Sequence, residues 1–273
     1  MEVKRFGKTG ALVSEIGMGT WYDWAWGGEE PGSGVAGKVK ALKAGLDGGM
    51  NFIDTAEIYQ TEPLVAKAIN GRKRDDLFIA TKVWQSHLHR DDLVRALERS
   101  LKSLGLSYVD LYQVHWPNSS VPIAETMAAM EECQNKGLLR AIGVSNFSLR
   151  EMTEANSALK KSEIASNQVN YSLEVREPER ELVPYCEKNK IAVIAYLPLG
   201  HGSLAAPGPK TEHVCKRNSK TPAQVALNWL VSKPAVFAIP RASNVPHVKE
   251  DLGASGWRLS RQDIGELESK YPL

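Results

Sequence analysis

Short apolar runs recur along this chain, and amphipathic segments separate them. The runs are mostly continuous rather than alternating, as expected of parallel strands that helices cover on both faces. They are SEIGMG, NFID, LFIATKV, VDLYQVH, LRAIGVS, ASNQVNY, IAVIAYLP and AVFAIP. A strand–helix–strand unit needs about 30 residues or more, so eight strands use nearly all of the 273 residues. The pattern therefore predicts an α/β fold, a single (β/α)8 TIM barrel.

The segments between these runs carry helical signals. DLVRALERSLKSLG, residues 92–105, repeats leucine at helical spacing and ends in a glycine that can stop the helix. PIAETMAAMEECQNKG, residues 122–137, has a similar pattern. TPAQVALNWLVSK, residues 221–233, begins with Thr221 as a candidate N-cap and Pro222 at the first helical position. We therefore expect helices in these three places.

The domain organisation follows from what surrounds the barrel pattern. VKRFGKTGALVSEIG predicts an N-terminal β-hairpin at residues 3–15 that plugs the barrel bottom. The barrel is expected over 16–260 and a short C-terminal tail over 261–273, all in one domain spanning 1–273. The alternative, a doubly wound open sheet, usually has GxGxxG after its first strand, and this sequence has none there.

Composition excludes several classes of partner. The 34 basic and 32 acidic residues leave a net charge of +2, which argues against nucleic-acid or membrane-surface binding. The three cysteines, Cys133, Cys186 and Cys215, are widely spaced, which predicts a reduced protein without a zinc site. We see no signal peptide and no run of about 18 apolar residues. The expectation is a cytoplasmic monomer that acts on a small molecule.

Polar residues end three successive predicted strands. Asp54 ends the second, Lys82 the third and His115 the fourth, while Tyr59 lies in the loop after Asp54. Each alone is more often structural, as a helix cap, a hydrogen-bonded core residue or packing. In a barrel, however, the carboxyl ends of the strands meet at one mouth, where active sites lie. The four residues are therefore candidates for one catalytic site.

The chemistry of the four types fits together. An ammonium such as Lys82 stabilises a nearby phenolate and lowers the pKa of a tyrosine, which is ordinarily near 10. Asp54 could hold Lys82 charged, Tyr59 could then act as a general acid, and His115 could donate a hydrogen bond to a carbonyl oxygen. If hydride is the arriving nucleophile, a nicotinamide must lie beside Tyr59 and His115.

A series of motifs then becomes informative. DTAEIY, the TK of IATKVW, the HWP of YQVHWP, GVSNF, NQVNY, YLPLG and IPRASN resemble the motif series of the aldo-keto reductases, from about residue 3 to residue 260. The resemblance implies a β/α barrel that binds NADP(H) without a Rossmann fold and reduces aldehydes and ketones. It makes Tyr59 the proton donor, Lys82 and Asp54 the residues that tune it, and His115 the residue that orients the carbonyl.

The same resemblance implies a set of cofactor contacts, although Tyr196 could be an ordinary strand aromatic and Ser145–Asn146 a helix N-cap. The matching positions are Gly19, Thr20, Trp21, Ser145, Asn146, Gln168, Tyr196, Leu197, Leu199, Gly200, Ile239, Arg241, Ala242, Ser243, His247, Glu250 and Asp251. Arg241 stands at the basic position that faces the 2′-phosphate, and a planar guanidinium suits phosphate. Ala242, His247 and Asp251 depart from the common serine, arginine and asparagine. Arg241 is then the one firm cation, and His247 adds a second only when it is protonated. We therefore expect NADPH to be preferred and NADH to be usable, with weaker discrimination between them above pH 7.

The substrate walls are expected from three aromatic residues at strand ends, Trp21, Trp84 and Trp116, although such residues also pack barrel rims. The segment 22–34, with Trp24 and Trp26, could be a lid or a rim. The sequence after the last barrel helix is too short for the long tail that narrows the pocket in many relatives, which predicts an open site with a broad range of carbonyl substrates. Gln60 stands where relatives usually have glycine, and its longer amide could crowd the cavity mouth or bond to substrate. His87 and His89 are more often solvated than metal ligands.

Two other functional classes remain open. One is a Schiff-base aldolase or lyase with Lys82 as the nucleophile. Asp54 argues against it, because a paired lysine stays protonated. The other is a non-catalytic barrel that binds the cofactor and regulates a partner.

Overall fold

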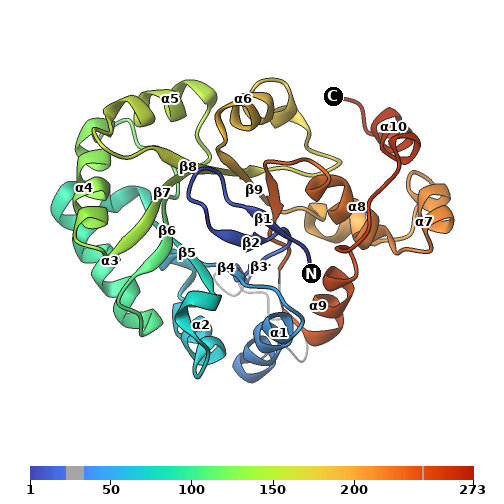
Figure 1. Ribbon diagram of the computed structural model, residues 1–273, viewed down its shortest axis with the longest axis horizontal. Coiled ribbons are helices and arrows are strands. Elements are labelled where there is room, and N and C mark those ends of the chain that lie inside the picture. The colour runs from blue at the N-terminus through green and yellow to red at the C-terminus, as the bar shows by residue number, and fades with distance from the viewer. Residues whose placement is uncertain (23–33, 242) are drawn as a thin grey trace.

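Eight parallel strands form the barrel at the centre of the computed structural model, which describes residues 1–22, 34–241 and 243–273 (Figure 1). Neighbouring strands in the sheet follow chain order, and every pair is parallel. The strands are β3 (Met18–Gly19), β4 (Phe52–Asp54), β5 (Phe78–Val83), β6 (Val109–Val114), β7 (Leu139–Ser145), β8 (Ile164–Asn170), β9 (Ala192–Tyr196) and β10 (Val236–Ala238). Each predicted apolar run overlaps one of them; seven runs contain their strand, and β8 begins one residue before its run.

Two isolated parallel bridges bring the ends of this sheet together. Ile16 pairs with Ala238, and Gly19 pairs with Arg241. The amide of Gly17 donates to the carbonyl of Ala238 at 2.8 Å. The predicted (β/α)8 fold is therefore confirmed, with β3 and β10 as the strands where the barrel closes.

Helices surround the barrel strands (Figure 1). They are α1 (Val35–Asp47), α2 (Glu62–Ile69), α3 (Arg90–Leu104), α4 (Ile123–Asn135), α5 (Leu149–Ala158), α6 (Leu182–Asn189), α7 (Glu212–Asn218), α8 (Pro222–Val231), α9 (Val245–Leu252) and α10 (Arg261–Lys270). Short 3-10 turns lie at η2 (Glu57–Tyr59), η3 (Arg74–Asp76), η4 (Gln85–His87), η5 (Glu177–Glu179) and η6 (Gly200–Ala205). The three predicted helices correspond to α3, α4 and α8, and Thr221 caps α8 through the amide of Gln224. None of the helices described is long and apolar enough to span a bilayer.

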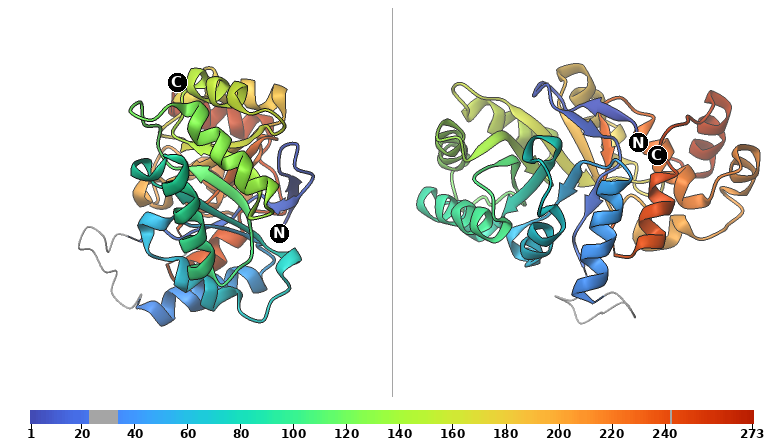
Figure 2. Two further views of the ribbon diagram at one scale, coloured as in Figure 1. Left: turned by 90° about the vertical axis from the view of Figure 1, so that its left-hand side faces the viewer. Right: turned by 60° about the horizontal axis from the view of Figure 1, so that its bottom comes forward.

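The N-terminal hairpin, β1 (Val3–Arg5) and β2 (Leu12–Ser14), is antiparallel and stands at one edge of the molecule (Figure 2). Phe6 follows β1 and is fully buried. Its ring centroid lies 6.2 Å from that of Phe52, 4.7 Å from that of Phe78 and 5.0 Å from that of Phe237. Phe6 therefore fills the amino-terminal end of the barrel, as a plug is expected to do.

The C-terminal segment differs from the expected short tail, because residues 261–270 form helix α10. Ser260 and Asp263 make a capping box at its start. Arg176, which is buried, donates to the carbonyl of Tyr271 at 2.7 Å and to that of Glu268 at 3.3 Å. The helix is thus anchored to the loop that follows β8.

Candidate active site

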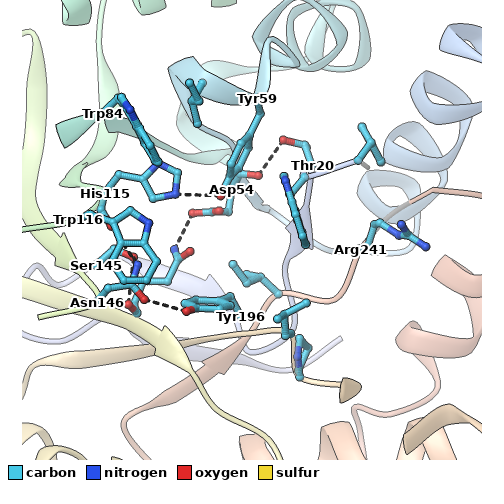
Figure 3. Close-up of a pocket in the computed structure, with 18 of the residues that line it drawn as sticks. Thr20, Asp54, Tyr59, Trp84, His115, Trp116, Ser145, Asn146, Tyr196 and Arg241 are labelled. Carbon is cyan, nitrogen blue, oxygen red and sulfur yellow. Dashed lines mark hydrogen bonds between the residues drawn. The ribbon is translucent and has the colours of Figure 1, made fainter. Parts of the chain in front are cut away.

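A cavity of about 660 Å³ opens at the carboxyl ends of the barrel strands (Figure 3). This volume is in the range of small-molecule sites. Asp54, Tyr59 and His115 line the cavity, and so do the three predicted wall residues Trp21, Trp84 and Trp116. The other lining residues are Gly19, Thr20, Tyr22, Ile58, Gln60, Ser145, Asn146, Gln168, Tyr196, Leu197, Pro198, Ile239 and Arg241.

Asp54 and Lys82 form a buried ion pair behind the cavity. In the sheet register Asp54 pairs with Ala80, so Lys82, two residues further on, faces the same interior. Lys82 Nζ lies 2.5 Å from Asp54 Oδ1 and 3.0 Å from the carbonyl oxygen of Thr55. Burial alone would lower the pKa of Lys82, but Asp54 and Tyr59 raise it above its ordinary value. Lys82 is therefore an ammonium.

Two glutamines hold the second carboxylate oxygen of Asp54. Gln168 Nε2 donates to Asp54 Oδ2 at 2.9 Å, and Gln113 Nε2 does so at 3.4 Å. A Cβ atom on Gly143 would lie 2.9 Å from Cγ of Gln113, so the glycine leaves space for this side chain. The sequence prediction did not include Gln113. The available signal was a polar residue inside the apolar run VDLYQVH, two positions before His115.

Tyr59 ends the one-turn helix η2 and reaches the cavity from the loop after β4. Its hydroxyl lies 3.2 Å from His115 Nε2, and Lys82 Nζ lies 4.9 Å from its ring centroid. Burial and the nearby Asp54 raise the pKa of Tyr59, while the charge and hydrogen bond of Lys82 lower it. The net pKa is above the ordinary value, so the expected net lowering was wrong: desolvation outweighs the ammonium. The hydroxyl stays protonated near neutral pH.

His115 follows β6 and is buried beside Tyr59. Burial, together with the charge of Lys82, lowers the pKa of His115 to about 2, so the imidazole is neutral. Its ring packs edge-to-face against Trp84, with centroids 5.2 Å apart. Asn146 Nδ2 donates to the backbone carbonyl of His115 at 3.0 Å. Nδ1 is buried and has no hydrogen-bond partner within the described part of the chain.

Four of the predicted cofactor residues, Tyr196, Asn146, Ser145 and Gln168, form one hydrogen-bonded chain, three of them labelled in Figure 3. Tyr196 Oη donates to Asn146 Oδ1 at 2.8 Å, and Asn146 Nδ2 donates to Ser145 Oγ at 3.1 Å. Ser145 Oγ in turn donates to the carbonyl of Gln168 at 3.0 Å. Ser145 and Asn146 do not cap the following helix, because Ser148 does so. The chain fixes polar atoms along one wall of the cavity.

The remaining predicted cofactor residues divide between the cavity wall and its surroundings. Leu197, Ile239 and Arg241 line the cavity. Leu199 precedes η6 and Gly200 begins it, beyond the residues that line the cavity in the described ranges.

Residues after Arg241 lead into helix α9, and Ala242 lies outside the described residues. Ser243 is buried, and its hydroxyl has no hydrogen-bond partner in the parts that are described. His247 is exposed in the first turn of α9. Burial and the nearby Glu250 raise the pKa of Asp251 well above its ordinary value.

The other predicted features have simpler outcomes. Residues 23–33, including Trp24 and Trp26, lie outside the described residues. His87 forms a hydrogen bond with the Glu57 carboxylate, and His89 forms one with the Glu125 carboxylate. Over residues 1–22, 34–241 and 243–273 there is no cluster of metal-ligating side chains.

Comparisons with known proteins agree with this architecture. The family model described as the aldo/keto reductase family matches residues 15–272. The aldo-keto reductase YhdN of Bacillus subtilis is 39% identical over 98% of this chain and 93% of its own. The methylglyoxal reductase YeaE of Escherichia coli is 34% identical over 94% of this chain and 90% of its own.

Solved structures are similar over the whole chain. A thermostable aldo-keto reductase in complex with the inhibitor epalrestat has a TM-score of 0.91 at 41% identity, covering 99% of this chain and 100% of its own. An aldo-keto reductase from Klebsiella pneumoniae in complex with NADPH has a TM-score of 0.89 at 35% identity, covering 99% and 95%. The chain therefore belongs to the aldo/keto reductase family of NAD(P)H-dependent oxidoreductases.

Proposed function

We propose that this protein reduces aldehydes and ketones with NADPH and that Tyr59 donates the proton. The observation that carries the proposal is the position of the Tyr59 hydroxyl, 3.2 Å from the neutral His115 and against the Lys82–Asp54 pair, in the wall of one cavity. An oxygen that accepts hydrogen bonds from both Tyr59 and His115 is polarised toward protonation.

The residues along the cavity fit NADPH by their chemistry. Asn146 offers an amide, and Tyr196 offers an aromatic ring beside it. At the far end, Arg241 carries a positive charge suited to a phosphate, and Ser243 leaves a buried hydroxyl without a described partner. Helix α9 begins directly after this segment, and helix N-termini favour anions. Asn146 and Tyr196 would hold the nicotinamide. Arg241, Ser243 and the start of α9 would hold the adenosine phosphate.

The proton transfer is then assigned to residues of this chain. Tyr59 donates its hydroxyl proton to the carbonyl oxygen. His115, with its proton on Nε2, donates a hydrogen bond to the same oxygen and sets its angle. Lys82, held charged by Asp54, stabilises the phenolate that remains on Tyr59. When bound, NADPH supplies the hydride that the reduction consumes.

The substrate range is expected to be broad. Trp84 and the half-exposed Trp116 line the cavity, and none of its described lining residues follows Arg241, so α10 contributes no wall. The likeness to methylglyoxal reductases makes small 2-oxoaldehydes the first substrates to test. We further propose that the protein is a monomer of one domain. Cys133, Cys186 and Cys215 are all free, which fits a reducing compartment.

The Schiff-base alternative is disfavoured by the ion pair. A lysine must lose its proton to attack a carbonyl, and Asp54 and Tyr59 raise the pKa of Lys82. Borohydride should therefore trap no adduct on Lys82.

The test is NADPH oxidation over a panel of carbonyls that includes methylglyoxal and aromatic aldehydes. We expect turnover of several members of the panel. If every carbonyl fails while the protein still quenches NADPH fluorescence, the catalytic proposal is wrong and the cofactor-binding regulator is favoured.

A further inference from the structure

Glu57 lies two residues before Tyr59 and begins the same turn, η2. Its carboxylate accepts a hydrogen bond from the backbone amide of Trp84 at 2.5 Å. His87 Nδ1 lies 3.0 Å and 3.2 Å from the two carboxylate oxygens, and an Arg99 nitrogen lies 3.7 Å from Oε2. The side chain is only 14% exposed. One carboxylate therefore joins η2 to the segment after β5 and to α3.

These contacts connect the two sides of the candidate catalytic site. Trp84 precedes η4, and its ring packs against His115 (Figure 3). Tyr59 and His115 also contact each other, with ring centroids 5.4 Å apart. Glu57 thus fixes the turn that carries Tyr59 relative to the tryptophan that supports His115.

The turn is short, so contacts with other segments have to hold it in place. It is three residues long, and an isolated turn of that length is not stable. Gln60, the next residue, has φ = +57°, a left-handed conformation that disfavours a residue other than glycine. Beyond it, the hydroxyl of Thr61 lies 2.9 Å from each of the hydroxyls of Thr20 and Thr55. Thr61 anchors the downstream end, and Glu57 anchors the upstream end.

We infer that Glu57 is a positioning residue, which holds Tyr59 and the Trp84–His115 pair in the geometry for proton transfer. The inference rests on the proposed function of Tyr59. The described residues that line the cavity do not include Glu57, so it acts through its neighbours and not on the substrate. Asp54, not Glu57, is the carboxylate that acts on the pKa of Tyr59. Glu57 therefore acts on the site by holding these segments in place and not by an electrostatic effect on Tyr59.

Two substitutions distinguish the effect of the length of the Glu57 side chain from the effect of its charge. Glu57→Gln keeps the length and an oxygen that can accept from the Trp84 amide, but it removes the charge. Glu57→Asp keeps the charge but withdraws the oxygens by one methylene. The matched control is Glu125→Asp, because Glu125 also accepts from a backbone amide, that of Arg90, and from a histidine, His89, outside the cavity wall in the described parts.

The measurements are kcat, KM for a small aldehyde, the Kd for NADPH by fluorescence quenching, and the thermal midpoint. The kcat value is expressed per cofactor-binding site, so unfolded protein does not count. Since a displacement of about 1 Å can cost on the order of a hundredfold in rate, we expect Glu57→Asp to lower kcat by about tenfold or more. Glu57→Gln and Glu125→Asp should retain kcat within about threefold, and all three variants should keep the wild-type Kd for NADPH.

The inference is overturned if Glu57→Asp keeps the wild-type kcat. It is also overturned if Glu57→Gln loses as much kcat as Glu57→Asp, because that result assigns the effect to charge. Failure of the proposed function is distinguishable from failure of this inference, because it does not involve the Glu57 variants. It would appear as a wild type that oxidises NADPH with no carbonyl, or as a Tyr59→Phe variant that is as active as the wild type.

Discussion

Lys82 Nζ lies 2.5 Å from Asp54 Oδ1, and neither side chain is more than 3% exposed. A buried ion pair adds little net stability, but removing one partner leaves an uncompensated charge and costs about 3–5 kcal/mol. The pair therefore makes the candidate site vulnerable to single substitutions.

We predict that Asp54→Asn lowers the free energy of unfolding by about 3 kcal/mol, because Lys82 is left charged and buried. The double variant Asp54→Asn/Lys82→Met should recover most of this stability and remain inactive. Urea unfolding measures both. Asp92→Asn, which breaks the exposed pair with Arg95, is the control and should leave the midpoint unchanged. A double variant no more stable than Asp54→Asn would contradict the explanation.

The reduction rate should be nearly constant from about pH 5 to pH 9. Tyr59 donates only when protonated, and its raised pKa keeps that form until the pH rises above the ordinary value. His115 acts as a neutral ring, a form that is lost only as the pH falls to its lowered pKa of about 2. The measurement is kcat/KM for one aldehyde against pH. A steep fall between pH 6 and pH 8 that Tyr59 or His115 causes would contradict these directions.

The free energy of unfolding should change with pH below neutrality because of His115, whereas the reaction rate should not. The unfolded chain binds a proton at this residue below its ordinary pKa of about 6.5, whereas the folded chain does so only near pH 2. Folding therefore loses stability as the pH falls from 6.5. Between pH 7 and pH 5 this loss is about 2 kcal/mol, and His115→Gln should remove it. The comparison of wild type with His115→Gln at the two pH values isolates this residue. Equal losses in the two proteins would show that His115 is not the cause.

Arg241 should determine the preference for NADPH over NADH. A hydrogen bond to a charged group contributes about 1.5–3 kcal/mol, so Arg241→Ala should raise KM for NADPH by about tenfold or more. KM for NADH should change by less than about threefold, because NADH lacks the 2′-phosphate. Arg261→Ala, on the exposed start of α10, is the control. A wild-type enzyme that clearly prefers NADH would show that this assignment is wrong.

Much of the fold was predictable because its signals are local. Each barrel strand is a short apolar run, and polar residues such as Asp54 and Lys82 stand where those runs end. The side-chain period of two then places both residues in the barrel interior. Helix α10 was missed although Ser260 and Asp263 form a capping box, because its core-facing residues are few: Asp263 and Leu267 are buried.

The parts that could not be predicted depend on contacts between distant segments. The pKa of Tyr59 is a balance between burial and two neighbouring charges, and sequence shows the charges but not the burial. Gln113 reaches Asp54 beside Gly143 of the neighbouring strand, where a Cβ atom would crowd the glutamine side chain. Glu57 meets Trp84 across two loops, and no motif relates them.

The most direct test of the account is the single-turnover rate of NADPH oxidation by Tyr59→Phe with saturating cofactor and methylglyoxal. Phenylalanine keeps the ring beside Lys82 and His115 and removes only the hydroxyl. We expect a rate about 10²- to 10⁴-fold below wild type, with fluorescence quenching by NADPH unchanged. A Tyr59→Phe rate equal to that of wild type would contradict the assignment of Tyr59 as the proton donor.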